Sequence, residues 1–195
     1  MIGATWKGIS YIRIKPVSVA NPRTEGQVNQ RNKFSATLAF LQPSLTFLKV
    51  GYKFYADKKS AFNAAMSYVI RNAITGTAPN FTVDYPTALV SRGKLEGVLD
   101  GAFTEASGTF SVSWTDNSTQ GNARPDDKVM LLLYNPAKAE SQIVLEDPAV
   151  RQDGGIVSVV PENYSGDSVH LFLAFQAADG SMVSNSSYLG SVTVS

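Results

Sequence analysis

Hydrophobic and polar positions follow two different periods along this chain, and the period changes near residue 84. Within residues 25–42, Phe34, Leu38 and Leu41 share one helical face. Apolar residues at 62, 66, 69 and 73 repeat that helical spacing. Beyond residue 84, apolar and polar residues alternate, as in strands with one buried face. The pattern therefore predicts a mixed α+β fold.

Residues 1–84 are expected to hold one strand and three helices. The β-branched stretch 5–15 indicates a strand. Thr24 and Gln27 fit a capping box, which predicts that the first helix begins at about residue 25.

The other two helices of this region are short. Pro43 ends the first helix, and a second is predicted to follow it before residue 57. Ser60 is suited to cap the third helix, and Gly76 is expected to end it.

Residues 85–195 are predicted to form an immunoglobulin-like antiparallel β-sandwich, because about seven short strands follow one another at regular spacing. Phe110, Val112 and Trp114 fall on one side of their strand, so we expect Trp114 to be buried. We predict that 1–84 and 85–195 are separate domains and that the second folds alone. The predicted strands are 81–84, 88–91, 94–99, 108–115, 128–135, 141–145, 156–160, 169–176 and 188–194.

Composition excludes several kinds of chemistry. The 195 residues include no cysteine, so disulfides, zinc–thiolate sites and thiol nucleophiles are absent. No segment reaches the ~20 apolar residues that a membrane-spanning helix needs. The start of the chain also lacks the pattern of a secretory signal, which favours a cytoplasmic protein or one that is part of an assembled particle.

Charge is divided unequally between the two regions. Residues 1–84 carry eleven basic and three acidic residues, a net charge of +8. Residues 85–195 carry six basic and thirteen acidic residues, a net charge of −7. Such a split bears on partners rather than on the fold.

Catalytic motifs are not found. His170 is the only histidine, and its place outside the apolar set of its strand predicts an exposed side chain. The loop from Asp116 to Gly121 with Asp127 has only a partial likeness to a calcium loop, and Asp126 and Asp127 are interpreted as loop acids. We therefore predict no enzymatic activity, no cofactor and no bound metal.

A basic surface near the first helix is the candidate functional site. Gln27 and Arg31 are one turn apart, with Arg23 at the expected cap. These residues suit a protein interface, contacts to nucleic-acid phosphates, or pairing with buried carbonyls or Asp84 within the chain. The interface candidates are Arg23, Gln27, Arg31, Lys33, Arg13 and Lys15.

Several blocks of residues resemble a bacterial family of unknown function. They are Trp6-Lys7-Gly8, Ile12-Arg13-x-Lys15-Pro16, Asn21-Pro22-Arg23-Thr24-x-x-Gln27-x-x-x-Arg31-x-x-Phe34, Phe62-Asn63-x-Ala65-Met66-Ser67-Tyr68, Leu89-Val90-Ser91-x-Gly93-x-Leu95 and Asn185-Ser186-x-Tyr188-Leu189-Gly190. The third block is also locally similar to phage virion-type proteins. The β-region resembles fibronectin type III and immunoglobulin-like sandwiches, with Trp114 as the core tryptophan. None of these resemblances implies catalytic residues.

Three functions remain open at this point. The first is a structural or assembly protein, because basic and acidic regions on one chain suit head-to-tail self-association or a protein partner. The second is a module that binds a glycan or a protein through its sandwich loops, where Tyr85, Tyr134 and Tyr164 are the expected exposed aromatics. The third is a nucleic-acid-binding protein that uses the basic region.

Overall fold

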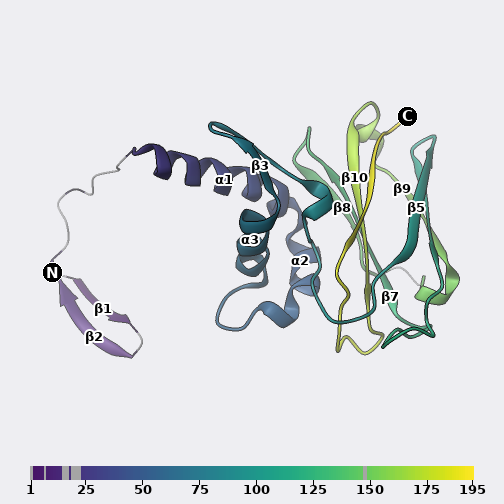
Figure 1. Cartoon of the computed structure of the whole chain (residues 1–195), viewed down its shortest axis with the longest axis horizontal. Helices are drawn as coiled ribbons and strands as arrows, with labels where there is room; N and C mark the ends of the chain where they lie inside the picture. Colours follow the sequence, from purple (N-terminus) through teal and green to yellow (C-terminus); the bar gives the residue numbers. More distant parts are fainter. Residues whose placement is uncertain (1, 7, 15–17, 19–22, 147–148) are drawn as a thin grey trace.

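The computed structural model describes residues 2–6, 8–14, 18, 23–146 and 149–195, and its fold is mixed α+β (Figure 1). The N-terminal residues form a hairpin of β1 (Ile2–Trp6) and β2 (Ile9–Arg13). The single strand predicted for 5–15 is therefore wrong. Gly8, with φ of +81°, adopts the left-handed conformation that the tight reversal requires.

Three α-helices follow, and most of their predicted limits are confirmed. They are α1 (Glu25–Leu41), α2 (Leu45–Gly51) and α3 (Ala61–Asn72), with short 3₁₀ turns at Gln42–Ser44 and Lys53–Tyr55. The hydroxyl of Ser60 accepts a hydrogen bond from the backbone N–H of Asn63 (3.1 Å), as predicted. Thr24 is at the N-cap of α1, but its side chain makes no capping hydrogen bond.

A second hairpin follows the three helices in the chain and precedes the strands of the two larger sheets. It consists of β3 (Ile74–Thr77) and β4 (Asn80–Val83), and a 3₁₀ turn at Tyr85–Thr87 follows it. Gly76 therefore lies within β3 and does not end α3, which stops at Asn72.

Two antiparallel sheets make up the rest of the chain. One has the order β5 (Leu99–Ala106), β6 (Thr109–Thr115), β9 (Gly155–Val159). The other has the order β11 (Ser187–Thr193), β10 (Ser168–Gln176), β7 (Lys128–Asn135), β8 (Glu140–Val144). Two 3₁₀ turns, Arg151–Asp153 and Glu162–Tyr164, interrupt the connections.

The four-stranded sheet is the middle layer of three. Its inner face packs against the three-stranded sheet, where Trp114 is 5% exposed, so the predicted burial of Trp114 is confirmed. Its other face packs against the helices, as Figure 1 shows. Strands β7 and β10 are consequently buried on both faces, like the strands of sheets covered on both sides.

Two strand predictions are wrong. Residues 88–91 form no strand, and 94–99 contributes only a bridge from Leu95 to Ser184 before β5 begins at Leu99. The division near residue 84 into separate domains stays a prediction. Helical residues such as Phe40 and sheet residues such as Phe172 belong to one continuous core.

Candidate functional site

The interface candidates that the structure describes do not form one surface. Gln27 and Arg31 are exposed on α1 and line a shallow hollow with Gln30 and Phe34. Arg23 is exposed just before that helix. Lys33 points elsewhere, because its ammonium lies 5.0 Å from the ring centre of Phe81 in β4.

The other two candidates belong to the start of the chain. Arg13 is exposed at the end of β2, whereas Lys15 lies outside the described residues. The structure therefore brings together Gln27 and Arg31 and places Arg13 on a separate hairpin.

That hairpin exposes an unusual amount of apolar surface. Ile12 is 73% exposed and Ile9 is 68% exposed. The register aligns Ile2 with Arg13 and Ala4 with Tyr11, so Ile2, Ile9 and Tyr11 share one face. A two-stranded hairpin with this much exposed apolar surface is only marginally stable in water.

The outer face of the three-stranded sheet is a second apolar surface. Val157 and Val159 on its edge strand β9 are 65% and 71% exposed. Beyond the bulge near Asp100, the outward positions of its three strands are uncharged: Ala102, Thr104, Ala106, Ser111, Ser113, Val157 and Val159. Solvated sheet faces and edges usually carry charges that prevent association, so this face is suited to contact.

His170 is half-buried, which corrects the expectation of an exposed histidine. Its ring stacks on Tyr85 with centroids 3.7 Å apart, and Nδ1 lies 2.9 Å from the hydroxyl oxygen of Tyr188. Burial lowers the pKa of His170 and raises the pKa of Tyr85 to about 12. In the described part of the chain, the partners of this histidine are tyrosines, which is not the arrangement of a serine–histidine–carboxylate site.

The depressed pKa of His170 makes stability depend on pH. In the unfolded chain the His170 imidazole takes up a proton near its ordinary pKa of 6.5. In the folded chain its pKa is lower, so the imidazole is still mostly neutral at that pH. We therefore expect the free energy of unfolding to be higher when the pH is above 6.5, and to decrease as the pH falls below 6.5. Urea unfolding at about pH 7.5 and about pH 5.5 measures this. His170→Gln should show a smaller decrease, and an unchanged decrease would contradict the assignment.

Two further sequence interpretations need correction. Tyr134 and Tyr164 are buried and Tyr85 is half-buried, so these tyrosines do not form an exposed loop surface. Asp127 does lie in the loop before β7, but its carboxylate is fully buried and paired with Arg151, with 2.9 Å between Oδ2 and Nε, which is not the arrangement of a calcium loop. Among the described residues, no group of three or more His, Cys, Asp or Glu side chains could hold a metal ion.

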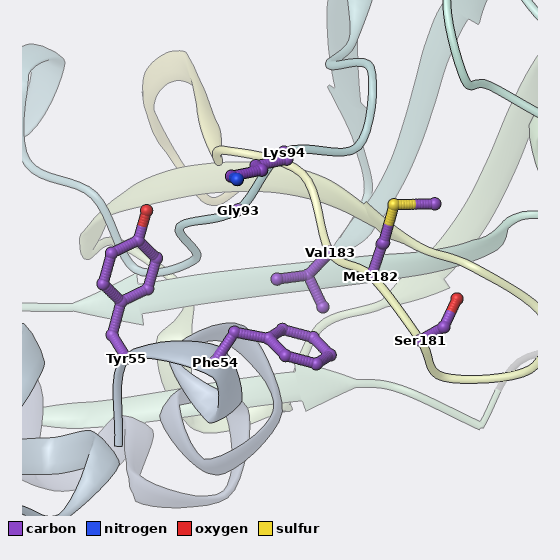
Figure 2. Close-up of a pocket in the computed structure, with 7 residues that line it drawn as sticks. All are labelled: Phe54, Tyr55, Gly93, Lys94, Ser181, Met182 and Val183. Atoms are coloured by element: carbon purple, nitrogen blue, oxygen red, sulfur yellow. The ribbon is translucent and has the colours of Figure 1, made fainter. Parts of the chain in front are cut away.

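A pocket of about 380 Å³ lies where the helical layer meets the sandwich loops (Figure 2). The turn after α2 provides Phe54 and Tyr55 on one side. Two loop segments of the β-region provide the other sides. The lining residues are Phe54, Tyr55, Gly93, Lys94, Ser181, Met182 and Val183.

Backbone contacts hold the walls of this pocket in place. The backbone N–H of Arg92 donates to the carbonyl of Gly51 (2.9 Å), and its guanidinium lies 4.3 Å from the ring centre of Tyr55. Leu95 N–H donates to the carbonyl of Val183 (3.0 Å). A Cβ on Gly93 would lie 1.9 Å from that same carbonyl oxygen, so only glycine permits this close approach.

The pocket is mainly apolar, with one cation at its rim. Phe54 is 47% exposed although its ring faces the buried Val183. The ammonium of Lys94 makes no hydrogen bond or ion pair within the described part of the chain. These residues could not be predicted from the sequence, because three distant segments form the pocket and no periodic pattern links them.

Fold and surfaces together define a mixed α+β protein in which helices cover one face of a two-sheet β-structure. No helix among the described residues is long and apolar enough to cross a membrane. The chain belongs to a family of unknown function, DUF6266, whose sequence pattern matches residues 1–190. This confirms the resemblance to an uncharacterised family. No curated protein matches the chain.

Proposed function

We propose that this protein is a non-enzymatic assembly module whose copies associate head to tail. The observation that carries the proposal is the N-terminal hairpin, which exposes Ile2, Ile9, Tyr11 and Ile12. A surface of this kind is stabilised when a second molecule covers it. Copies that associate head to tail close into rings or extend as filaments.

The acceptor surface in the next copy is the uncharged outer face of the three-stranded sheet. Its small side chains, such as Ala102 and Ser111, leave a flat surface for a β-hairpin. The exposed Val157 and Val159 provide apolar contacts. Strand β9 is also an edge strand, so its backbone can pair with an added strand.

Charge favours the same orientation of the two copies. The donor hairpin lies in the region of net charge +8, and the acceptor face in the region of net charge −7. Attraction between the two regions brings copies together and opposes contacts between like ends.

The strand arrangement supports an immunoglobulin-like interpretation of the sandwich. The seven strands of the sandwich are β5 to β11 in chain order. The first, second and fifth of them (β5, β6 and β9) form one sheet, and the seventh, sixth, third and fourth (β11, β10, β7 and β8) form the other. Immunoglobulin-like sandwiches serve many unrelated functions, so this likeness does not by itself specify a role. The local similarity of residues 21–34 to phage virion-type proteins favours a surface or virion-like assembly as the setting.

Light scattering on nuclease-treated protein tests the proposal. We expect a mass above the 20.9 kDa of one chain at low salt. Raising the salt from about 0.1 M to about 1 M reduces the Debye length from ~10 Å to ~3 Å and should weaken the association. The double variant Val157→Lys and Val159→Lys should weaken it by about tenfold or more, because contact would bury unpaired charges.

Matched variants separate the acceptor face from general surface effects. Leu45→Lys places a charge on an exposed apolar residue of α2 and should leave the mass unchanged. Arg23→Glu with Arg31→Glu should weaken the association further at low salt. A monomer at every concentration would exclude self-association. Retention of the untreated chain on a nucleic-acid column would instead favour the phosphate-binding alternative.

A further inference from the structure

We infer that the pocket between the helices and the sandwich loops binds a small apolar group that carries a carboxylate. This inference is independent of the assembly proposal, because no residue of the N-terminal hairpin or the outer sheet face lines the pocket. Its volume of about 380 Å³ lies within the range of small-molecule sites.

The walls specify an apolar, flat part of the ligand. In Figure 2 the ring of Phe54 and the side chain of Val183 face one another, with Tyr55 to one side and Met182 to the other. Phe54 remains 47% exposed in this position, so a ligand that covers the ring removes apolar surface from water. Aromatic and thioether side chains provide favourable contacts for an aromatic or branched aliphatic group.

The rim specifies a negative charge. Lys94 lines the pocket, and its ammonium has no partner within the described residues. Lys53 begins the turn that carries Phe54 and Tyr55, and its ammonium donates to the carbonyl of Gly180 (3.4 Å). Arg92 stacks on Tyr55 and adds a third positive charge nearby. Asp179 is an acid close to Lys53, and its pKa is lowered by its hydrogen bonds to Ser181 and by Lys53.

Hydrogen-bonding groups at the rim suit a carboxylate. The hydroxyl of Tyr55 makes no side-chain hydrogen bond in the described part of the chain, whereas the hydroxyl of Ser181 is hydrogen-bonded to Asp179. A carboxylate accepts from an ammonium and from hydroxyl donors together. A free aromatic acid and the C-terminus of a peptide that ends in an aromatic residue share this chemistry.

Methyl NMR on the whole chain tests the inference directly. The chain has four methionines, and with [¹³C]methyl-methionine labelling Met182 reports on the pocket, while buried Met66 and Met130 report on the core between helices and sheet. Titration with 3-phenylpropionate should shift the Met182 signal with saturation and leave the other two unchanged. We expect a Kd of about 1 mM, as befits a ligand of this size.

Matched ligands and variants identify what is recognised. 3-Phenylpropionamide has the same shape without the charge and should bind more weakly. Lys94→Gln should weaken binding of the acid about threefold to fivefold, as for a solvent-exposed charge pair, and leave binding of the amide unchanged. Phe54→Ala should weaken both by about tenfold through loss of apolar contact. Lys49→Gln, on the exposed side of α2, serves as the charge control.

The source of the carboxylate is distinguished with a second pair of probes. Acetyl-Gly-Phe with a free C-terminus is compared with its C-terminal amide. Tighter binding of the peptide acid identifies a protein C-terminus as ligand, and tighter binding of 3-phenylpropionate identifies a small free acid. The inference is wrong if Met182 does not shift at about 10 mM of either acid, or if acid and amide bind equally well.

Discussion

Replacing Arg151 with methionine should lower the free energy of unfolding by about 3–5 kcal/mol, because it leaves the carboxylate of Asp127 buried without its counter-charge. Arg151 is fully buried, and its Nε donates to Oδ2 of Asp127 (2.9 Å). Its Nη1 donates to Oδ1 of Asn117 (2.6 Å), and its Nη2 to the carbonyl of Glu96 (2.8 Å). No other ion pair in the described part of the chain is buried to this degree.

The same side chain joins several loops to the core of the sandwich. The guanidinium lies 3.9 Å from the ring centre of Phe175 in β10, and its contacts to Gly97 and Asn117 fix the connections on either side of the β5–β6 hairpin. Loss of the side chain therefore removes packing as well as charge.

Urea unfolding followed by circular dichroism measures this effect, with two comparisons. Lys138→Met removes the partly exposed pair with Asp167 and should cost far less stability than Arg151→Met. The double variant Arg151→Met and Asp127→Asn should be more stable than Arg151→Met alone, because the uncompensated charge is gone. If Arg151→Met cost less than about 1 kcal/mol, the buried pair would not be a major source of stability.

The sequence predicted the elements whose signals are local. Ser60 lies three residues before the N–H that it caps, and the spacing of Phe62, Met66 and Val69 specified α3. Strand β6 alternates strictly, which placed Phe110, Val112 and Trp114 inside.

Elements whose signals depend on other parts of the chain were missed. In β5 the inward positions include Gly101, where a Cβ would lie 2.7 Å from the Leu189 side chain. Glycine at this position, where strand propensity disfavours it, leaves room for the Leu189 side chain of the other sheet. The strand is also bulged between Leu99 and Ala102, which interrupts its pairing with β6.

Burial of β7 and β10 on both faces explains why the environment of His170 was predicted wrongly. Residues 129–134 are a continuous apolar run, the pattern of a strand covered on both sides, whereas the prediction for His170 rests on one buried face per strand. Phe172 and Ala174 lie on the same side of β10 as His170 and pack under the helices. This places the histidine against Tyr85 rather than in solvent.

The candidate sites could be predicted only in part. Gln27 and Arg31 do lie together, because an i, i+4 spacing on a helix is a local relation. Lys33 is two residues further on and therefore faces β4. The pocket depends on contacts such as that of Gly93 with Val183, which are ninety residues apart and leave no mark in periodicity or composition.

Replacing Trp114 with alanine should lower the free energy of unfolding by about 3–5 kcal/mol, the range for a large aromatic removed from a core. The ring is 5% exposed and meets Phe175 edge to face, with centroids 5.6 Å apart. Its indole N–H donates to the carbonyl of Arg151 (2.7 Å). The variant therefore loses apolar burial and leaves the Arg151 carbonyl with only the long hydrogen bond from the Gly154 N–H (3.4 Å).

Two matched variants separate these contributions when unfolding is followed by circular dichroism. Trp114→Phe keeps a ring but loses the N–H donor, and should cost about 1–2 kcal/mol. Phe34→Ala removes a half-exposed aromatic from α1 and should change stability by less than about 1 kcal/mol. Trp114 and Arg151 both contact Phe175. The double variant Trp114→Ala with Arg151→Met should therefore lose less free energy of unfolding than the sum of the losses of the two single variants. Strict additivity would mean that the two side chains stabilise the sandwich independently, contrary to the contacts that they share.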